Sequence, residues 1–324
     1  MRIGILDQMP QPKGWTAEET ATGALEMARH AENMGYGSYW FAEHHATRGM
    51  VSSSPEIMMA AAAARTESIK VGSGGILLPQ YSAYKVAAQI SQLESLYPGR
   101  IEAGVGRSTG GGEFVRKRLA DFKHNQMGDY PEKLEALTGY LNKEGQVRAA
   151  PRTEGKPELY ALGLGENSAE MAASLGIGYV FGHFIKPDRG EASFETYRRN
   201  FKPGLLASPK AKACVFVVCG EDDEHAEHLS ASQHIWLLNV EKGLDSQVPD
   251  VKTAQKRMAS LNEKEKESVG KNRKRMIIGG PEKVKRELDH FSEIYQCEDW
   301  LLLTNLYDWE EKRKSFERVS ELYL

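Results

Sequence analysis

The chain has few cysteines, no long apolar run and no excess of basic residues. Its three cysteines, Cys214, Cys219 and Cys297, are widely spaced and odd in number, which argues against a disulfide framework or a zinc site and indicates a reducing compartment. No apolar run approaches the roughly 18 residues that a membrane span needs, and the N-terminus lacks a signal-peptide pattern. The net charge of −3 gives no footprint for nucleic acid. We therefore expect a cytoplasmic protein that binds neither membranes nor nucleic acid.

A short aromatic stretch over residues 39–45 anchors the predicted fold. It starts apolar and ends in one acid and two histidines, as a buried strand does where it emerges at a sheet edge. Residues 17–34 before it carry apolar side chains at helical spacing and are followed by a glycine, which indicates a helix. Residues 2–7 are a further apolar run that ends in an acid. Strand, helix and strand in this order predict a parallel α/β fold with its chemistry at the carboxyl ends of the strands.

The same alternation continues along the whole chain. Eight strands are predicted, over residues 2–7, 39–45, 69–75, 101–106, 158–165, 179–181, 211–219 and 300–304. The 324 residues are enough for one (β/α)8 barrel of ~250 residues plus insertions, although two ordinary domains would also fit. Because eight strands alternate with helices, we expect a single α/β domain over residues 1–324, a (β/α)8 TIM barrel.

Residues 240–274 depart from this alternation after the seventh predicted strand and its helix. The segment is polar, rich in lysine and glutamate and weakly periodic, with few apolar side chains to anchor it. We interpret it as an insertion, placed to cover the mouth of the barrel as a mobile lid.

Several segments match a known family in order and spacing. Residues 41–45 (FAEHH), 71–79 (VGSGGILLP) and 99–107 (GRIEAGVGR) resemble the bacterial luciferase-like flavin monooxygenases, and residues 163–176 and 279–284 also fit. The resemblance implies a (β/α)8 barrel that uses reduced FMN or a deazaflavin analogue, usually as a dimer. The light-emitting members have a reactive cysteine where this chain has Gly106, so light emission from a long-chain aldehyde is not implied. The chain looks closer to the uncharacterised bacterial oxidoreductases of the family.

His44 and Arg107 are the candidates for catalysis. On a strand, His44 and His45 would point to opposite faces and would not easily share one metal, so no metal site is expected. A neutral imidazole at the barrel mouth suits proton transfer to or from flavin, peroxide or substrate; the alternative is that both histidines are structural. Arg107 is interpreted as a cation near flavin or substrate, with a surface salt bridge as the alternative. His183, Asp7 and Gln8 also follow strands and are further candidates to line the mouth.

Glycines at two strand ends are candidates to contact the cofactor ring. Gly74 and Gly75 lack a Cβ and so allow close approach to a flat ring; the alternative is an ordinary turn. In the family this position often carries a non-proline cis peptide against the isoalloxazine. Gly106 ends the fourth predicted strand. The run around it only superficially matches a dinucleotide fingerprint, because the spacing is wrong.

Two predicted helix starts are candidates to bind the cofactor phosphate. Gly163, Leu164 and Gly165 end the fifth predicted strand, and Ser168 lies where the next helix begins. A helix N-terminus offers free N–H groups and a positive dipole end, which suit a phosphate; plain helix capping is the alternative. Gly280, at another helix start, is the second candidate.

The favoured interpretation is a flavin-dependent monooxygenase that uses reduced FMN and O2 to oxidise a small organic substrate. The chain has no separate nicotinamide domain, so reduced flavin is expected from a partner reductase, and a homodimer is expected from the resemblance. One alternative is deazaflavin-dependent hydride transfer on the same scaffold. Another is a flavin-binding protein without turnover.

Overall fold

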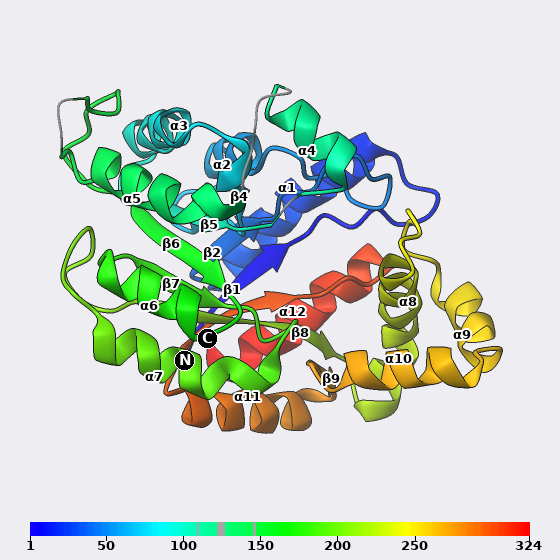
Figure 1. Cartoon of the computed structure of the whole chain (residues 1–324). Coiled ribbons are helices and arrows are strands. Elements are labelled where there is room, and N and C mark those ends of the chain that lie inside the picture. Colours follow the sequence, from blue (N-terminus) through cyan, green and yellow to red (C-terminus); the bar gives the residue numbers. More distant parts are fainter. Residues whose placement is uncertain (109, 122–126, 145–146) are drawn as a thin grey trace.

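Eight parallel strands form a closed barrel at the centre of the fold, and helices surround it (Figure 1). The computed structural model describes residues 1–108, 110–121, 127–144 and 147–324. The barrel strands in the described residues are β1 (Arg2–Asp7), β2 (Ser38–Phe41), β3 (Lys70–Ser73), β5 (Ile101–Gly106), β6 (Glu158–Gly163), β7 (Gly178–Phe181), β8 (Ala211–Cys219) and β10 (Asp299–Leu303). The barrel closes because β10 pairs with both β1 and β8. The predicted (β/α)8 TIM barrel is confirmed.

Two short strands lie beside the barrel strands. β4 (Ile76–Leu77) pairs with β5, and β9 (Met276–Gly279) pairs with β8. The sequence pattern predicts no strand at β9, which directly follows the polar segment 240–274 and lies just before the next predicted helix.

The starts of the outer helices follow capping signals in the sequence. Thr16 and Glu19 form a capping box at the start of α1, and Pro55 stands in the first turn of α2. The outer helices of the described chain are α1 (Ala17–Asn33), α2 (Pro55–Ala63), α3 (Ala83–Leu96), α4 (Glu113–Leu119), α5 (Tyr130–Leu141), α6 (Glu166–Ser174), α7 (Gly190–Asn200), α8 (Asp223–Glu241), α9 (Val251–Ala259), α10 (Glu263–Arg273), α11 (Pro281–Tyr295) and α12 (Trp309–Tyr323).

The polar segment 240–274 contains the helices α9 and α10. Both pack beside α8 (Figure 1). The segment has more apolar anchors than its composition indicates, because Ala254, Leu261 and Val269 are buried in a small cluster with residues of α8. Whether the segment acts as a lid stays a prediction.

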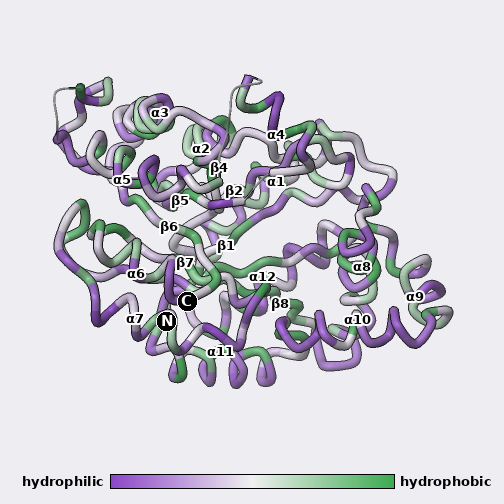
Figure 2. The backbone as a smooth tube through the Cα atoms, viewed as in Figure 1, coloured by the Kyte–Doolittle hydropathy of each residue, from purple (hydrophilic) through white to green (hydrophobic). Residues whose placement is uncertain are grey.

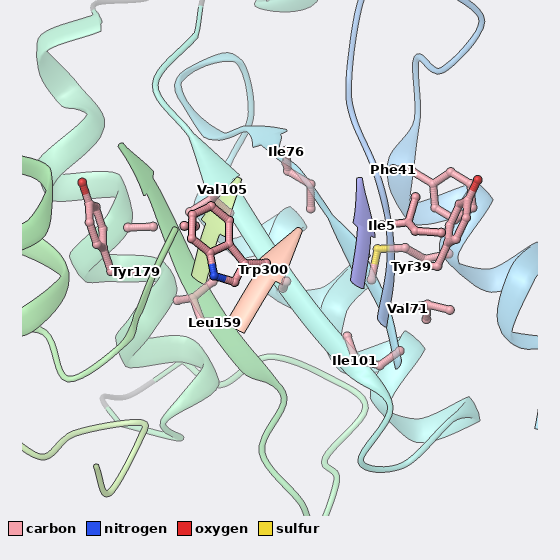
Figure 3. Close-up of a cluster of buried hydrophobic side chains, with 14 of the residues drawn as sticks. Ile5, Tyr39, Phe41, Val71, Ile76, Ile101, Val105, Leu159, Tyr179 and Trp300 are labelled. Atoms are coloured by element: carbon pink, nitrogen blue, oxygen red, sulfur yellow. The ribbon is translucent and has the colours of Figure 1, made fainter. Parts of the chain in front are cut away.

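Alternate residues of the strands serve two apolar layers. Ile5, Tyr39 and Phe41 belong to the cluster between the barrel and the helices, part of which Figure 3 shows. Leu6 follows Ile5, and Trp40 lies between Tyr39 and Phe41. Both belong to a second cluster, because successive side chains of a strand point to opposite faces. In Figure 2 the central strands are largely hydrophobic and the outer helices carry most of the hydrophilic residues.

Charged side chains are paired inside the barrel. Lys212 is 4% exposed, and its Nζ lies 3.2 Å from Glu102 Oε2 and 3.3 Å from Asp299 Oδ1. Trp40 Nε1 donates to Glu102 Oε2 at 2.7 Å. Burial lowers the pKa of Lys212, but the two carboxylates outweigh burial and the pKa ends above its usual value. The lysine is therefore a buried cation that two acids hold in place.

Replacing this lysine tests how much the pairing contributes. In Lys212→Met, Glu102 and the half-buried Asp299 lose the cation between them. Their remaining cationic partners in the described chain are the more exposed Lys70 and Arg2, so we expect the free energy of unfolding to fall by about 3–5 kcal/mol. Chemical denaturation at pH 7 measures it. The deficit should shrink as the pH falls toward 4, because the two carboxylates then take up protons.

The control is Lys285→Met, which breaks a half-exposed pair with Asp289 on the surface of α11. Such a pair is worth less than about 1 kcal/mol. Equal effects of the two substitutions would contradict a stabilising role for Lys212.

Candidate active site

A cavity of about 1180 Å³ opens at the carboxyl ends of the barrel strands. The predicted site residues that line it are His44, Gly74, Gly75, Gly106, Arg107, Gly163, Leu164, Gly165 and Ser168. The structure does not bring Gly280 there, and its amide N donates to Asp223 Oδ1 at 2.8 Å. Among the described residues of segment 240–274, none lines the cavity.

Both histidines after β2 line the cavity. The expectation that His44 and His45 point to opposite faces is wrong, because β2 ends at Phe41 and the alternation of a strand does not extend into the loop beyond it. The backbone turns there, with a φ of 51° at Ala46.

His44 is held by its backbone and not by its ring. Its amide N donates to Ser52 O at 2.8 Å. Its ring Nδ1 is buried and has no hydrogen-bond partner within the described chain. Burial, with a contribution from His45, lowers the pKa of His44 to about 4. The imidazole is therefore neutral at pH 7, with a nitrogen that can accept or donate a proton.

His45 is fixed by a buried acid. Glu43 Oε1 lies 2.6 Å from His45 Nε2 and accepts from the Tyr81 hydroxyl at 2.5 Å. Glu43 Oε2 accepts from the amide N of Leu77 at 2.9 Å. Burial raises the pKa of Glu43, against the effect of these hydrogen bonds. The sequence does not predict Glu43 and Tyr81 as site residues. Their role depends on contact with each other, and the two lie 38 positions apart and meet only in the fold.

Bare backbone faces the cavity at the ends of β3 and β5. The peptide bond between Gly74 and Gly75 is cis, as the family resemblance implies. A Cβ on Gly75 would lie 2.9 Å from Gly104 O, so this position does not accept a side chain without a shift. A Cβ on Gly106 would meet no heavy atom within 4 Å. The cavity is therefore open above Gly106.

The end of β6 and the start of α6 form a polar part of the cavity. Ser168 Oγ donates to Gly165 O at 2.7 Å. A Cβ on Gly163 would collide with Ser168 Oγ, so glycine is needed for this close approach.

Arg189 is a cavity residue that the sequence pattern did not indicate. A Cβ on Gly165 would lie 3.8 Å from Arg189 Nη1, which places the guanidinium beside the N-terminus of α6. Arg189 lies 24 positions after Gly165 in a short polar turn, and nothing in that turn signals a contact with the end of β6. With Arg107 after β5, the described residues give the cavity two arginine side chains.

Two other candidates from the sequence lie in the helix layer. His183 is 1% exposed, and its Nδ1 lies 2.9 Å from the Tyr295 hydroxyl. Asp7 accepts from the Tyr39 hydroxyl at 2.6 Å and from Lys312 Nζ at 3.0 Å. The expectation that these two residues line the mouth is wrong, since neither is among the residues that line the cavity. Gln8, the next residue in the chain, does line it.

The described residues have neither a membrane-spanning helix nor a cluster of metal ligands. None of their helices is long and apolar enough to cross a membrane. They contain no group of three or more histidine, cysteine, aspartate or glutamate side chains that could hold a metal ion.

Comparison with solved structures gives full-length matches to the same barrel. The structure of apo-MsnO8 has a TM-score of 0.90 at 31% identity, over 99% of this chain and 98% of that chain. A Type II Baeyer-Villiger monooxygenase of Pseudomonas putida, solved in complex with FMN, has a TM-score of 0.71 at 19% identity, over 99% and 97%. An F420-dependent secondary alcohol dehydrogenase has a TM-score of 0.68 at 16% identity, over 98% and 97%. At 19% and 16% identity, the last two matches show a shared fold and nothing further.

Sequence comparison identifies the family. The uncharacterized protein YceB of Bacillus subtilis is 45% identical over 332 residues, covering 100% of each chain. The N-acetyl-S-alkylcysteine monooxygenase of the same organism is 31% identical, covering 100% of this chain and 98% of the relative. A family model described as luciferase-like monooxygenase matches residues 1–295. The chain therefore belongs to the luciferase-like monooxygenase family.

Proposed function

We propose that this protein is a monooxygenase that uses reduced FMN and O2 to oxidise a small organic substrate. One observation carries the proposal: bare glycine backbone at the end of β3 and a cationic helix N-terminus after β6 face the same cavity. Glycine backbone suits a flat ring, and a helix N-terminus with arginines suits a phosphate. The cavity of about 1180 Å³ has room for FMN and a small second molecule.

The residues present fit FMN in a definite arrangement. Gly74, Gly75 and Gly106 would contact the ring, while Ser168 and Arg189 would hold the phosphate. Reduced FMN, when bound, supplies the electrons that activate O2. The apolar interior around Leu6 and Trp40 keeps water from the reacting atoms.

His44 is proposed as the residue that moves a proton in this cavity. Its neutral ring can accept or donate a proton, and its Nδ1 has no hydrogen-bond partner among the described residues. Glu43 and Tyr81 hold the neighbouring His45 and so fix the loop that carries both histidines. Arg107, at the end of β5, is proposed to stabilise negative charge on the flavin or the substrate. A positioned, neutral imidazole favours an enzyme over a flavin-binding protein without turnover.

The second candidate function is deazaflavin-dependent hydride transfer. It is favoured by the F420-dependent alcohol dehydrogenase, which shares the fold. Titration of the protein with FMN and with F420, followed by fluorescence, distinguishes the two cofactors. We expect FMN to bind more tightly.

A partner reductase, a homodimer and a lid are proposed together with the monooxygenase function. The described chain forms one barrel, so reduced FMN is proposed to come from a separate reductase, and the working form is proposed to be a homodimer. Residues 240–274 are proposed to act as a lid. Two hydrogen bonds join this segment to the edge of the cavity: Asp245 Oδ1 accepts from Thr47 Oγ1 at 2.6 Å and from the amide N of Arg48 at 2.7 Å. Thr47 itself lines the cavity.

The phosphate site is tested by Ser168→Asp. A carboxylate at this helix start would repel a phosphate, so we expect the affinity for FMN to fall tenfold or more, which is about 1.4 kcal/mol. Riboflavin, which has no phosphate, is the matched ligand and should bind the variant as it binds the wild type. Ser168→Ala controls for loss of the hydroxyl. An unchanged affinity for FMN would place the phosphate elsewhere.

The ring site is tested by Gly106→Leu. The new side chain would enter open cavity, so the barrel should fold normally while FMN loses at least tenfold in affinity. Gly139→Leu on α5 is the control, because a Cβ there also meets nothing within 4 Å and Gly139 does not line the cavity. Thermal unfolding and fluorescence titration measure the two effects. Normal FMN binding by Gly106→Leu would contradict this arrangement.

The role of His44 is tested by His44→Ala and His44→Gln. Both variants should retain FMN, and turnover should fall by about 10²–10⁴-fold, the usual effect of losing a positioned acid or base. Stopped-flow absorbance of reduced FMN with O2 and a substrate that the wild type oxidises gives the rate. A wild-type rate in His44→Ala would exclude His44 from proton transfer.

A pH series adds an independent signature of His44. Its pKa is about 4 in the folded state, below its usual value of 6.5, so the stability that His44 contributes is present above pH 6.5 and lost as the pH falls toward 4. His44→Gln should therefore lose less stability than the wild type over this interval. Identical pH profiles would show that burial does not perturb His44.

A further inference from the structure

The barrel divides its cavity into two halves. The proposed flavin contacts lie at the ends of the consecutive strands β3, β5 and β6, where Arg189 also reaches Gly165 from the loop after β7. The opposite half is built from β7, β8, β10 and β1 and from the loop after β2. Apolar side chains and one amide line it, namely Met50, Val180, Phe184, Cys214, Leu301 and Gln8, and the loop after β2 adds the polar side chains of His44, His45 and Thr47. If FMN occupies the first half, the second half is the space left for the organic substrate.

A chain of hydrogen bonds sets the orientation of the Gln8 amide. Gln8 Oε1 accepts from Asn305 Nδ2 at 2.7 Å. Asn305 is 1% exposed, and its backbone N donates to Gln233 Oε1 at 2.9 Å. Gln233 is fully buried on α8. The carbonyl end of Gln8 is thus fixed toward the barrel wall by two buried amides.

The nitrogen of Gln8 is left for a ligand. No hydrogen bond of Nε2 to another described residue is seen, while Oε1 is already engaged. An amide NH2 has two donors and no acceptor. Gln8 therefore offers hydrogen-bond donors in the apolar half of the cavity, where a matching group is an acceptor oxygen.

The charges of the cavity indicate which kind of acceptor fits. The lysine and arginine side chains among the described residues that line it are Arg107 and Arg189, and they belong to the loops after β5 and β7. Arg189 lies beside Gly165, at the proposed phosphate site. Beside Gln8 the described lining has no lysine or arginine to compensate a buried carboxylate, which would be costly to desolvate.

We propose that Gln8 determines substrate specificity by donating an N–H to a neutral carbonyl-type oxygen on an otherwise apolar substrate. This inference rests on the proposed function, because it assumes that FMN fills the other half of the cavity. It names a substrate class of ketones, esters, thioesters and amides, and it excludes simple carboxylates and plain hydrocarbons.

The test measures binding of small probes to the FMN-loaded protein by quenching of flavin fluorescence. The probes are 2-heptanone and N-methylhexanamide as neutral carbonyl compounds, 2-methyl-1-heptene as the carbonyl-free analogue of the ketone, and heptanoate as the carboxylate. We expect the wild type to bind both carbonyl compounds about tenfold more tightly than the other two probes, as one satisfied hydrogen bond allows.

Variants connect this preference to Gln8. Gln8→Leu should remove the preference and leave the affinity for FMN unchanged. Gln11→Leu is the matched control, since Gln11 bonds Trp15 O and does not line the cavity, and it should keep the preference. Asn305→Leu should weaken the preference, because it frees the Gln8 amide to turn.

The outcomes separate this inference from the proposed function. If FMN binds normally but the alkene or heptanoate binds as well as the ketone, or if neither carbonyl compound binds, the role of Gln8 is wrong and the flavin site stands. If Gln8→Leu keeps the preference for carbonyl compounds, the role of Gln8 is likewise wrong and the flavin site stands. If FMN fails to bind the wild type, the proposed function fails and this inference fails with it.

Discussion

Closure of the barrel is the constraint on which the rest of the structure depends. β10 pairs with β1 on one side and with β8 on the other, with Leu301 opposite Gly4 and Cys214. All pairings in the ring are parallel, so every strand ends at the same rim, and groups from distant parts of the chain meet there. The bond between Asn305 and Gln8 spans 297 positions and exists only because the last strand returns to the first.

The rim combines two kinds of local structure with different physical origins. At β3 and β5 the chain presents glycine backbone: a side chain at Gly75 would collide with neighbouring backbone, and Gly106 leaves the cavity open above it. After β2 it presents side chains on a loop that buried hydrogen bonds hold in place, with Glu43 bonded to Leu77 and Tyr81. A flat cofactor suits the first, and proton transfer suits the second. Their meeting at one cavity is what makes a flavin enzyme the best-supported proposal.

Burial also sets the charge states at this rim. His44 is neutral at pH 7 because desolvation disfavours its cation. Deeper in the barrel, Lys212 stays charged because Glu102 and Asp299 compensate its burial. The difference is the presence of partners: the lysine is paired on both sides, whereas His44 Nδ1 has none within the described residues. The proposed roles follow this difference: proton transfer for His44, and a contribution to stability for the paired lysine.

The sequence by itself determined the barrel, the family and several of the residues that line the cavity. Alternation of apolar strands with amphipathic helices is a local property, and so are glycines at strand ends, so both can be read from the chain. The structure alone decided which side chains face the cavity beyond the strand ends. His45 faces it although strand alternation predicts otherwise, His183 packs against Tyr295, and Arg189 reaches Gly165 from another loop. These placements depend on loop conformations and on contacts between strands far apart in the chain, which no local pattern records.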